Sequence, residues 1–281
     1  MVRHPVSRPI DVLHLGRDRV ICAYEIDGVI VDPGPASCVD TLIDRLGPTE
    51  PRALLLTHIH LDHAGATGVL CRRYPKLKVY VHELGAPHLI DPSKLLQSAG
   101  QVWGDDMWEL WGEVAPVPEE RVTTLSGGET VEGFRVAYTP GHATHHVSYL
   151  HEESGDAYVG DVAGVRIPPH PFTVAPTPPP DIDVEAWLDS LHTIACWNAQ
   201  SLRLTHFGQV TEVMEHLHRM RMALVDSAER ARQKDEETFI ARMEQELLRH
   251  TDPATVECFE QAAPPNQLYM GLERYWRKKA E

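Results

Sequence analysis

One short run of residues constrains the fold of this chain more than any other. Ala53-Leu54-Leu55-Leu56-Thr57 is almost wholly apolar, which suits a strand buried on both faces of a sheet. It is followed at once by His58-Ile59-His60-Leu61-Asp62-His63. Side chains that bind divalent cations through imidazole nitrogen or carboxylate oxygen therefore stand where a rigid strand ends. We expect an α/β chain with a metal site at a sheet edge.

The spacing within this run lets it serve two metal ions. His58 and His60 are two residues apart, so an extended backbone places them on one side. Asp62 and His63 lie where a helix would begin and can face a neighbouring point. One run cannot close both coordination shells, so further ligands are expected at other strand ends.

Three later strand ends carry residues of that kind. His142 follows an apolar strand within Thr139-Pro140-Gly141-His142, Asp161 follows the strand Ala157–Val159, and His206 follows Leu202–Leu204. Converging strand ends are where α/β folds build sites. The alternative is ordinary turn chemistry, since Pro-Gly-His and Gly-Asp are common turn sequences.

The remaining pattern alternates strands and helices around one body. A helix capped by Ser37 is expected to Leu46, and seven prolines between Pro168 and Pro180 predict an extended loop. No clean linker divides the chain, so we expect a single domain over 1–281. It has a core at 1–209 and a helical extension at 210–281, and the first helix of this extension runs to His250.

The expected strands are Ile10–Leu15, Val20–Ile26, Val29–Val31, Lys78–Val81, Val122–Leu125, Phe134–Thr139, Val147–His151 and Ser201–Thr205. Further helices are expected at 64–74 and 184–198.

Composition narrows the class of partner. Acidic residues outnumber basic ones by 41 to 26, and the net charge of -15 disfavours a nucleic-acid partner. The five cysteines form no CxxC pair, which fits reduced thiols in the cytoplasm. No signal-peptide core and no apolar run of membrane-spanning length is seen. We expect a soluble cytoplasmic protein that acts on a small molecule, without a nucleic-acid or membrane partner.

The order HxHxDH, TPGH, an Asp after a strand and a late His resembles the metallo-β-lactamase superfamily over about residues 10 to 210. The resemblance implies an αβ/βα sandwich of two mixed β-sheets flanked by helices. It also implies two divalent metal ions with a hydroxide between them as nucleophile, and Asp62 as the residue that orients it or accepts its proton. The implied ligands are His58, His60 and His142 for the first metal, Asp62, His63 and His206 for the second, and Asp161 for both.

Asp161 makes the chain resemble one branch of the superfamily more than the others. One lactamase subclass needs a Cys ligand at this position, and other lactamases commonly lack the bridging carboxylate. A bridging Asp resembles glyoxalase II and lactonases, so we expect hydrolysis of a small ester, thioester or lactone. Zinc suits the His/Asp ligand set best, although iron or manganese also fits.

Three alternatives stay open. The first is a mononuclear iron enzyme similar to persulfide dioxygenases, with His58, His142 and Asp161 as its ligands. The second is a phosphodiesterase of the same fold. The third is a metal-binding module without activity.

Several residues are candidates for the surroundings of the site. His146 matches the second histidine of the pattern GHTxGH and is expected to hold a ligand or a loop by a hydrogen bond. His145 replaces the glycine of that pattern and adds a side chain near the site.

Trp108 and Trp111 are three residues apart and are predicted to share one helix face. They form either an apolar lid over the metals or ordinary packing. His88 and His170 either line the pocket or lie in surface loops. The charged C-terminal helices form a solvated, packed extension, and a homodimer contact there stays open.

Overall fold

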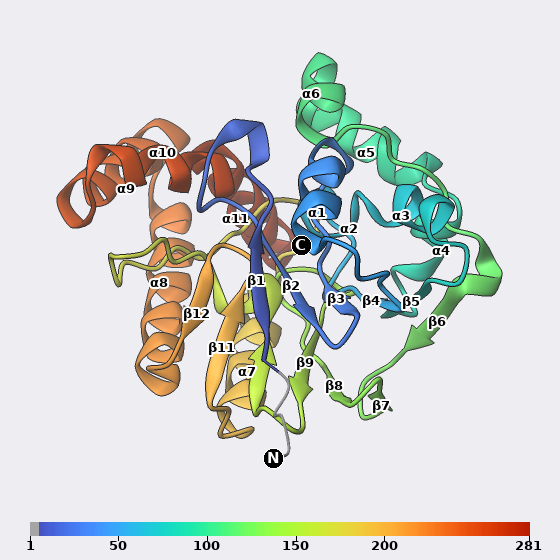
Figure 1. Ribbon diagram of the computed structural model, residues 1–281. Helices are drawn as coiled ribbons and strands as arrows, with labels where there is room; N and C mark the ends of the chain where they lie inside the picture. The colour runs from blue at the N-terminus through green and yellow to red at the C-terminus, as the bar shows by residue number, and fades with distance from the viewer. Residues whose placement is uncertain (1–5) are drawn as a thin grey trace.

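The computed structural model describes residues 6–281, and two six-stranded sheets flanked by helices form its body (Figure 1). Residues 1–5, on which part of the expectation about a signal segment rests, lie outside the described residues. The first sheet is antiparallel from β1 to β3 and parallel from β3 to β6. Its strands are β1 (Arg8–Asp11), β2 (Cys22–Ile26), β3 (Val29–Val31), β4 (Ala53–Leu55), β5 (Lys78–His82) and β6 (Val122–Leu125), in that order.

The second sheet is antiparallel except for the parallel pair β10 and β11. Its order is β12-β11-β10-β9-β8-β7. The edge strands β7 and β12 were not predicted, because two or three residues are too few to carry a period-two pattern. The strands are β7 (Thr130–Val131), β8 (Phe134–Tyr138), β9 (Val147–His151), β10 (Asp156–Tyr158), β11 (Ser201–Leu204) and β12 (Gly208–Val210).

The expectation for the apolar run at 53–57 is confirmed. All three residues of β4 are buried, and the strand pairs in parallel with β3 and β5. Backbone hydrogen bonds join the two sheets where this strand ends: Val147 N–H donates to Thr57 O at 2.8 Å, and Cys22 N–H donates to Thr205 O at 2.8 Å. The exits of strands from both sheets are thereby held side by side.

One group of helices follows strands of the first sheet, and a second group lies among or after the strands of the second sheet. The first group is α1 (Val39–Leu46), α2 (Leu61–Ala64), α3 (Thr67–Arg73), α4 (Ala86–Ile90), α5 (Ser93–Trp103) and α6 (Met107–Trp111). The second group is α7 (Val184–Ala195), α8 (Val213–Gln233), α9 (Glu236–His250), α10 (Pro253–Ala262) and α11 (Pro265–Ala280). None of the helices in the described part of the chain is long and apolar enough to cross a membrane.

Two local predictions are wrong. The expected helix from residue 210 to His250 is broken into α8 and α9, because the Asp235 side chain accepts a hydrogen bond from Thr238 N–H at 2.8 Å and begins a new helix. Ser37 does not cap α1. It lies in a 3-10 turn, Ala36–Cys38, and its hydroxyl donates to Leu110 O.

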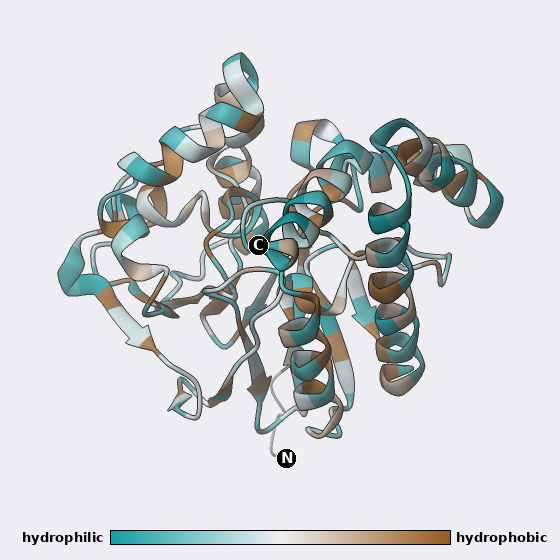
Figure 2. Ribbon diagram, turned by 180° about the vertical axis from the view of Figure 1, so that it is seen from behind, coloured by the Kyte–Doolittle hydropathy of each residue, from teal (hydrophilic) through white to brown (hydrophobic). Residues whose placement is uncertain are grey.

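The C-terminal helices are part of the main apolar core. Met220 of α8 and Leu272 of α11 belong to the same buried cluster as Leu54 of β4 and Val159. At one end of the molecule, α5 and α6 lie on one side and α10 and α11 on the other (Figures 1 and 2). The loops at this end of both sheets lie between these two groups of helices.

Candidate metal centre

The structure brings all seven predicted ligands together. Atoms of His58, His60 and His142 that could bind a cation lie within 4.8 Å of one another, and so do those of Asp62, His63 and His206. Ligand atoms of a third group, His58, His63 and Asp161, also lie within 4.8 Å of one another. This group shares His58 with the first group and His63 with the second. These overlapping groups define two adjacent positions at which a cation could bind.

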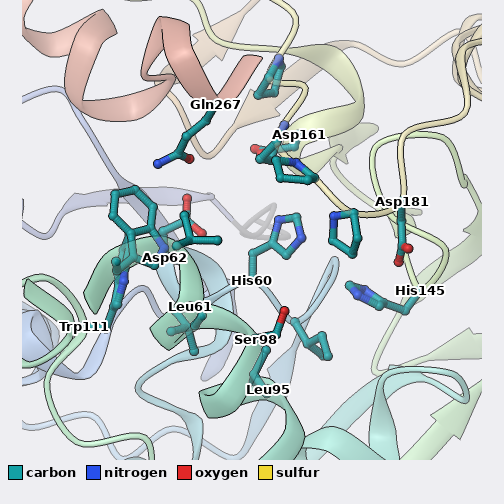
Figure 3. A pocket seen from close by; sticks show the side chains of 18 of the residues that line it. His60, Leu61, Asp62, Leu95, Ser98, Trp111, His145, Asp161, Asp181 and Gln267 are labelled. Atoms are coloured by element: carbon teal, nitrogen blue, oxygen red, sulfur yellow. The ribbon is translucent and has the colours of Figure 1, made fainter. Parts of the chain in front are cut away.

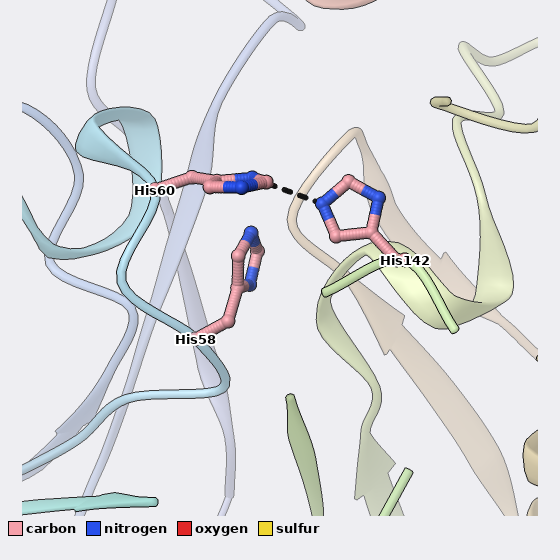
Figure 4. Close-up of side chains that lie close together, drawn as sticks. All are labelled: His58, His60 and His142. Carbon is pink, nitrogen blue, oxygen red and sulfur yellow. Dashed lines mark hydrogen bonds between the residues drawn. The ribbon is translucent and has the colours of Figure 1, made fainter. Parts of the chain in front are cut away.

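The first position is enclosed by three imidazoles (Figure 4). Nδ1 of His60 lies 3.0 Å from Nε2 of His142, and Nε2 of His58 is buried without a hydrogen-bond partner among the described residues. Nδ1 of His142 donates to Pro176 O at 2.8 Å, because a carbonyl can only accept. Nε2 of His142 is therefore left as the nitrogen with a free lone pair.

The second position is built from the same run and from the end of β11. Oδ2 of Asp62 lies 3.7 Å from Nε2 of His63 and 3.3 Å from Nε2 of His206. Nδ1 of His206 donates to Val20 O at 2.6 Å, which again fixes the tautomer and turns Nε2 toward the site.

Asp161 reaches both positions with different oxygens. Its Oδ2 lies 3.3 Å from Nε2 of His142, whereas its Oδ1 lies 3.2 Å from Nε2 of His63 and 3.5 Å from Nε2 of His206. One carboxylate is thus placed to bind one cation through each oxygen.

Buried atoms without partners test whether the residues fit metal ions. Nε2 of His63, Nε2 of His206 and Oδ1 of Asp161 are buried and, within residues 6–281, lie at ion-pair distance from one another and from Asp62 without a well-formed hydrogen bond. Leaving such a group unsatisfied costs about 1–3 kcal/mol. Divalent cations at the two positions would satisfy these atoms, so the donor set fits the ions that the resemblance implies.

The electrostatics divide the histidines into two kinds. Burial lowers the pKa of His58 well below its ordinary value and lowers that of His60 to about 3, which favours the neutral ligand form. Burial also opposes the charge on His63 and His206, but the carboxylates of Asp161 and Asp62 outweigh it and raise both pKa values. Without metal, protons on these two imidazoles balance the carboxylates.

A buried carboxylate behind the site was not singled out from the sequence. Asp32 is 1% exposed and directly follows β3. Its Oδ2 accepts from Nδ1 of His63 at 2.9 Å, from Thr57 Oγ1 at 2.7 Å and from Thr205 Oγ1 at 3.1 Å. Since Thr57 Oγ1 donates to Asp32, it accepts from Nδ1 of His58 at 3.1 Å. Asp32 therefore fixes ligands of both positions, and its place at a strand exit was the available signal.

Two glycines let the ligand loops approach closely. Gly141 precedes His142, and a Cβ there would lie 2.4 Å from Trp187 Cα. Gly160 precedes Asp161 with a φ of +46°, and a Cβ would lie 2.5 Å from Thr57 Oγ1. Trp187 holds the second loop as well, because its indole N–H donates to Val162 O at 2.7 Å.

The four histidines predicted to surround the site have different positions in the structure. His146 is buried, and its Nδ1 forms a hydrogen bond with Thr139 Oγ1 at 2.9 Å, as expected for a residue that holds a loop. His145 and His88 line the pocket above the site. His170 does not line it, and its Nε2 lies 2.8 Å from Oδ2 of Asp252 outside the pocket.

The paired-tryptophan prediction is wrong for one residue. Trp111 is buried, lines the pocket and stacks on His14. Trp108 is 72% exposed and is absent from the pocket lining. Trp103 takes the expected place, with its ring edge against Trp111 at 5.3 Å between centroids.

A pocket of about 350 Å³ lies over the two positions (Figure 3). Its floor contains His60, Asp62 and Asp161. Its walls come from α5, from the proline-rich loop and from the junction of α10 and α11. The size is that of a small-molecule site.

Comparisons with known proteins agree with this geometry. The family model described as "Metallo-beta-lactamase superfamily" matches residues 23–195. The metallo-beta-lactamase fold-containing protein ST1585 of Sulfurisphaera tokodaii is 30% identical over 223 residues, which cover 75% of this chain and 81% of that protein. A crystal structure of ST1585 superposes with a TM-score of 0.71 at 24% identity, over 97% of this chain and 99% of that one.

Two further proteins are similar over part of their length. A hydroxyacylglutathione hydrolase of Synechococcus sp. is 30% identical over 136 residues, which are 47% of this chain and 42% of that protein. The crystal structure of TTHA1623 in a di-iron-bound form has a TM-score of 0.51 at 26% identity, over 68% of this chain and 85% of that one.

Proposed function

The chain belongs to the metallo-beta-lactamase superfamily, and on that premise we propose that it is a dinuclear metal-dependent hydrolase of a small ester, thioester or lactone. The observation that carries the proposal is Asp161, whose two oxygens face different groups of histidines. Asp161 would bind both ions, which are most simply zinc, although the di-iron form of TTHA1623 is also compatible with iron. His58, His60 and His142 would hold the first ion, and Asp62, His63 and His206 would hold the second.

Two cations at these positions would lower the pKa of a water molecule and polarise the scissile carbonyl. Asp62 lines the pocket floor and is partly exposed, so its carboxylate can orient the attacking water and accept its proton. The water oxygen forms a bond to the carbonyl carbon, and the bond to the leaving alcohol or thiol breaks. The proton then passes from Asp62 to that leaving group.

The second set of ligands argues against an oxygenase with one iron. An iron at His58, His142 and Asp161 would leave Nε2 of His63 and of His206 buried, with the carboxylates of Asp62 and Asp161 at ion-pair distance but no well-formed hydrogen bond. A second ion would bind these two nitrogens directly, which a single iron at the first position does not do. A phosphodiesterase with the same ligands stays as the second candidate within the fold.

Activity of the metal-loaded chain tests the proposal. We expect hydrolysis of a simple ester such as p-nitrophenyl acetate, and a loss of at least about a hundredfold in His60→Ala. His218→Ala is the matched control, since this histidine is exposed on α8 and does not line the pocket. Equal background rates for the wild type and His60→Ala, with esters and phosphodiesters alike, would overturn the proposal.

A further inference from the structure

Helix α5 presents an apolar face that the protein covers only in part. Leu95, Ala99, Val102 and Trp103 line the pocket together with Ser98, at the spacing of one helix face. Amphipathic helices normally bury such a face against the core, yet no residue of α5 is buried. The face is directed at the cavity above the metal positions.

The opposite wall is also apolar. It consists of prolines of the loop after β10, among them Pro176 and Pro178, and of Ala263 and Leu268 at the junction of α10 and α11. An apolar ligand between this wall and α5 would remove both surfaces from water at once, which is favourable in proportion to the area covered.

Charge on these walls is sparse and balanced. Apart from the proposed metal ligands, the carboxylate and ammonium groups among the described lining residues are Asp181 and Lys94, one of each sign. A leaving group such as glutathione, with two carboxylates, finds no cluster of basic side chains to pair with. An uncharged ligand does not need basic side chains to pair with.

One polar group is available between the metals and the apolar walls. Gln267 of α11 is only 9% exposed, lines the pocket and extends into it in Figure 3. Its side-chain amide has no hydrogen bond to another described residue, so it can donate to a carbonyl of the ligand.

We propose that the substrate carries an uncharged apolar acyl chain; this proposal rests on the hydrolase function proposed above. The chain would lie between α5 on one side and, on the other, the wall formed by the proline-rich loop and the α10–α11 junction. The metal positions at the floor then face the carbonyl group, and Gln267 faces the polar end of the molecule. The leaving group is uncharged rather than a glutathione thiol.

A chain-length series on the metal-loaded protein tests this. With p-nitrophenyl acetate and p-nitrophenyl octanoate, both below micelle-forming concentrations, kcat/KM should be at least about tenfold higher for the octanoate. In Ala99→Glu, which places a carboxylate on the pocket-facing side of α5, that ratio should fall at least about fivefold. Gln101→Glu, on an exposed part of the same helix outside the lining, should keep the wild-type ratio.

Two results would overturn the inference while leaving the hydrolase function intact. One is a wild-type ratio near one. The other is a higher kcat/KM for S-lactoylglutathione than for the octanoate. Both comparisons use the wild type alone, so they hold even if Ala99→Glu fails to fold.

A binding measurement separates the inference from the proposed function. Trp103 and Trp111 line the pocket, so their fluorescence should change on titration with octanamide, and much less with acetamide. If neither ester is hydrolysed but octanamide binds, the hydrolase proposal fails and the apolar site stands. If octanamide does not bind, the inference fails, whatever the activity.

Discussion

Nδ1 of His63 donates to Oδ2 of Asp32 at 2.9 Å, and the same oxygen accepts from Thr57, whose hydroxyl in turn accepts from His58. A single buried carboxylate behind the site thus sets the tautomer of one histidine in each proposed metal position. Hydrogen bonds of this kind make imidazole a better ligand and fix its ring.

Asp32→Asn tests that relationship. The amide would turn an N–H toward one of the present donors, so the orientation of His63 should be lost and metal affinity should fall about 10- to 100-fold. Metal titration of the chelator-treated protein measures the change. Asp27→Asn is the matched control, since Asp27 is exposed in the β2–β3 turn, where Asn is well tolerated. Unchanged affinity in Asp32→Asn would contradict this role.

Gly160→Ala should destabilise the loop that carries Asp161. Alanine would pay for both the positive φ and the close contact with Thr57, together about 2–4 kcal/mol in the free energy of unfolding. Gly16→Ala also has a positive φ but open space around its Cβ, so it should lose only about 1 kcal/mol. Urea denaturation measures both. Equal losses would show that the contact with Thr57 has no weight.

Metal binding should weaken as the pH falls. The carboxylates of Asp161 and Asp62 raise the pKa values of His63 and His206, so these imidazoles hold protons that a metal ion must displace. Calorimetric titration of zinc at about pH 7 in buffers of different ionisation enthalpy should show that protons are released on binding. Affinity that does not vary with pH would contradict the proposed ligand set.

His216 should make the fold sensitive to acid. Burial lowers its pKa from 6.5 to about 4, and its Nε2 bonds Ala163 O at 2.8 Å in the loop that follows Asp161. The folded state therefore binds fewer protons than the unfolded state between these values. Stability is lost as the pH falls from 6.5 towards 4, by at most about 3 kcal/mol. His216→Gln should have a flatter pH profile of unfolding than the wild type, and identical profiles would refute the assignment.

The sequence predicted the site better than its surroundings, for a physical reason. His58, His142, Asp161 and His206 all stand two to four residues after the end of a strand, and strand ends are fixed by the sheets that hold them. Asp32 follows the same rule, but the two prolines and the glycine after it are also typical of an ordinary turn.

The walls of the pocket depend on tertiary contacts that no local pattern encodes. The spacing of Trp108 and Trp111 predicts one helix face, yet Trp108 is exposed, and Trp103 from α5 lines the pocket beside Trp111. Gln267 could not be found, because α11 meets the site only through folding of the C-terminal helices onto the sheets.

The central claim is that Asp161 bridges two metal ions. Anomalous diffraction from a crystal of the metal-loaded protein tests it most directly. We predict two peaks about 3.5–4 Å apart, one among His58, His60 and His142 and the other among Asp62, His63 and His206, with one oxygen of Asp161 bound to each. A single peak, or two peaks with Asp161 bound to only one, would contradict the account.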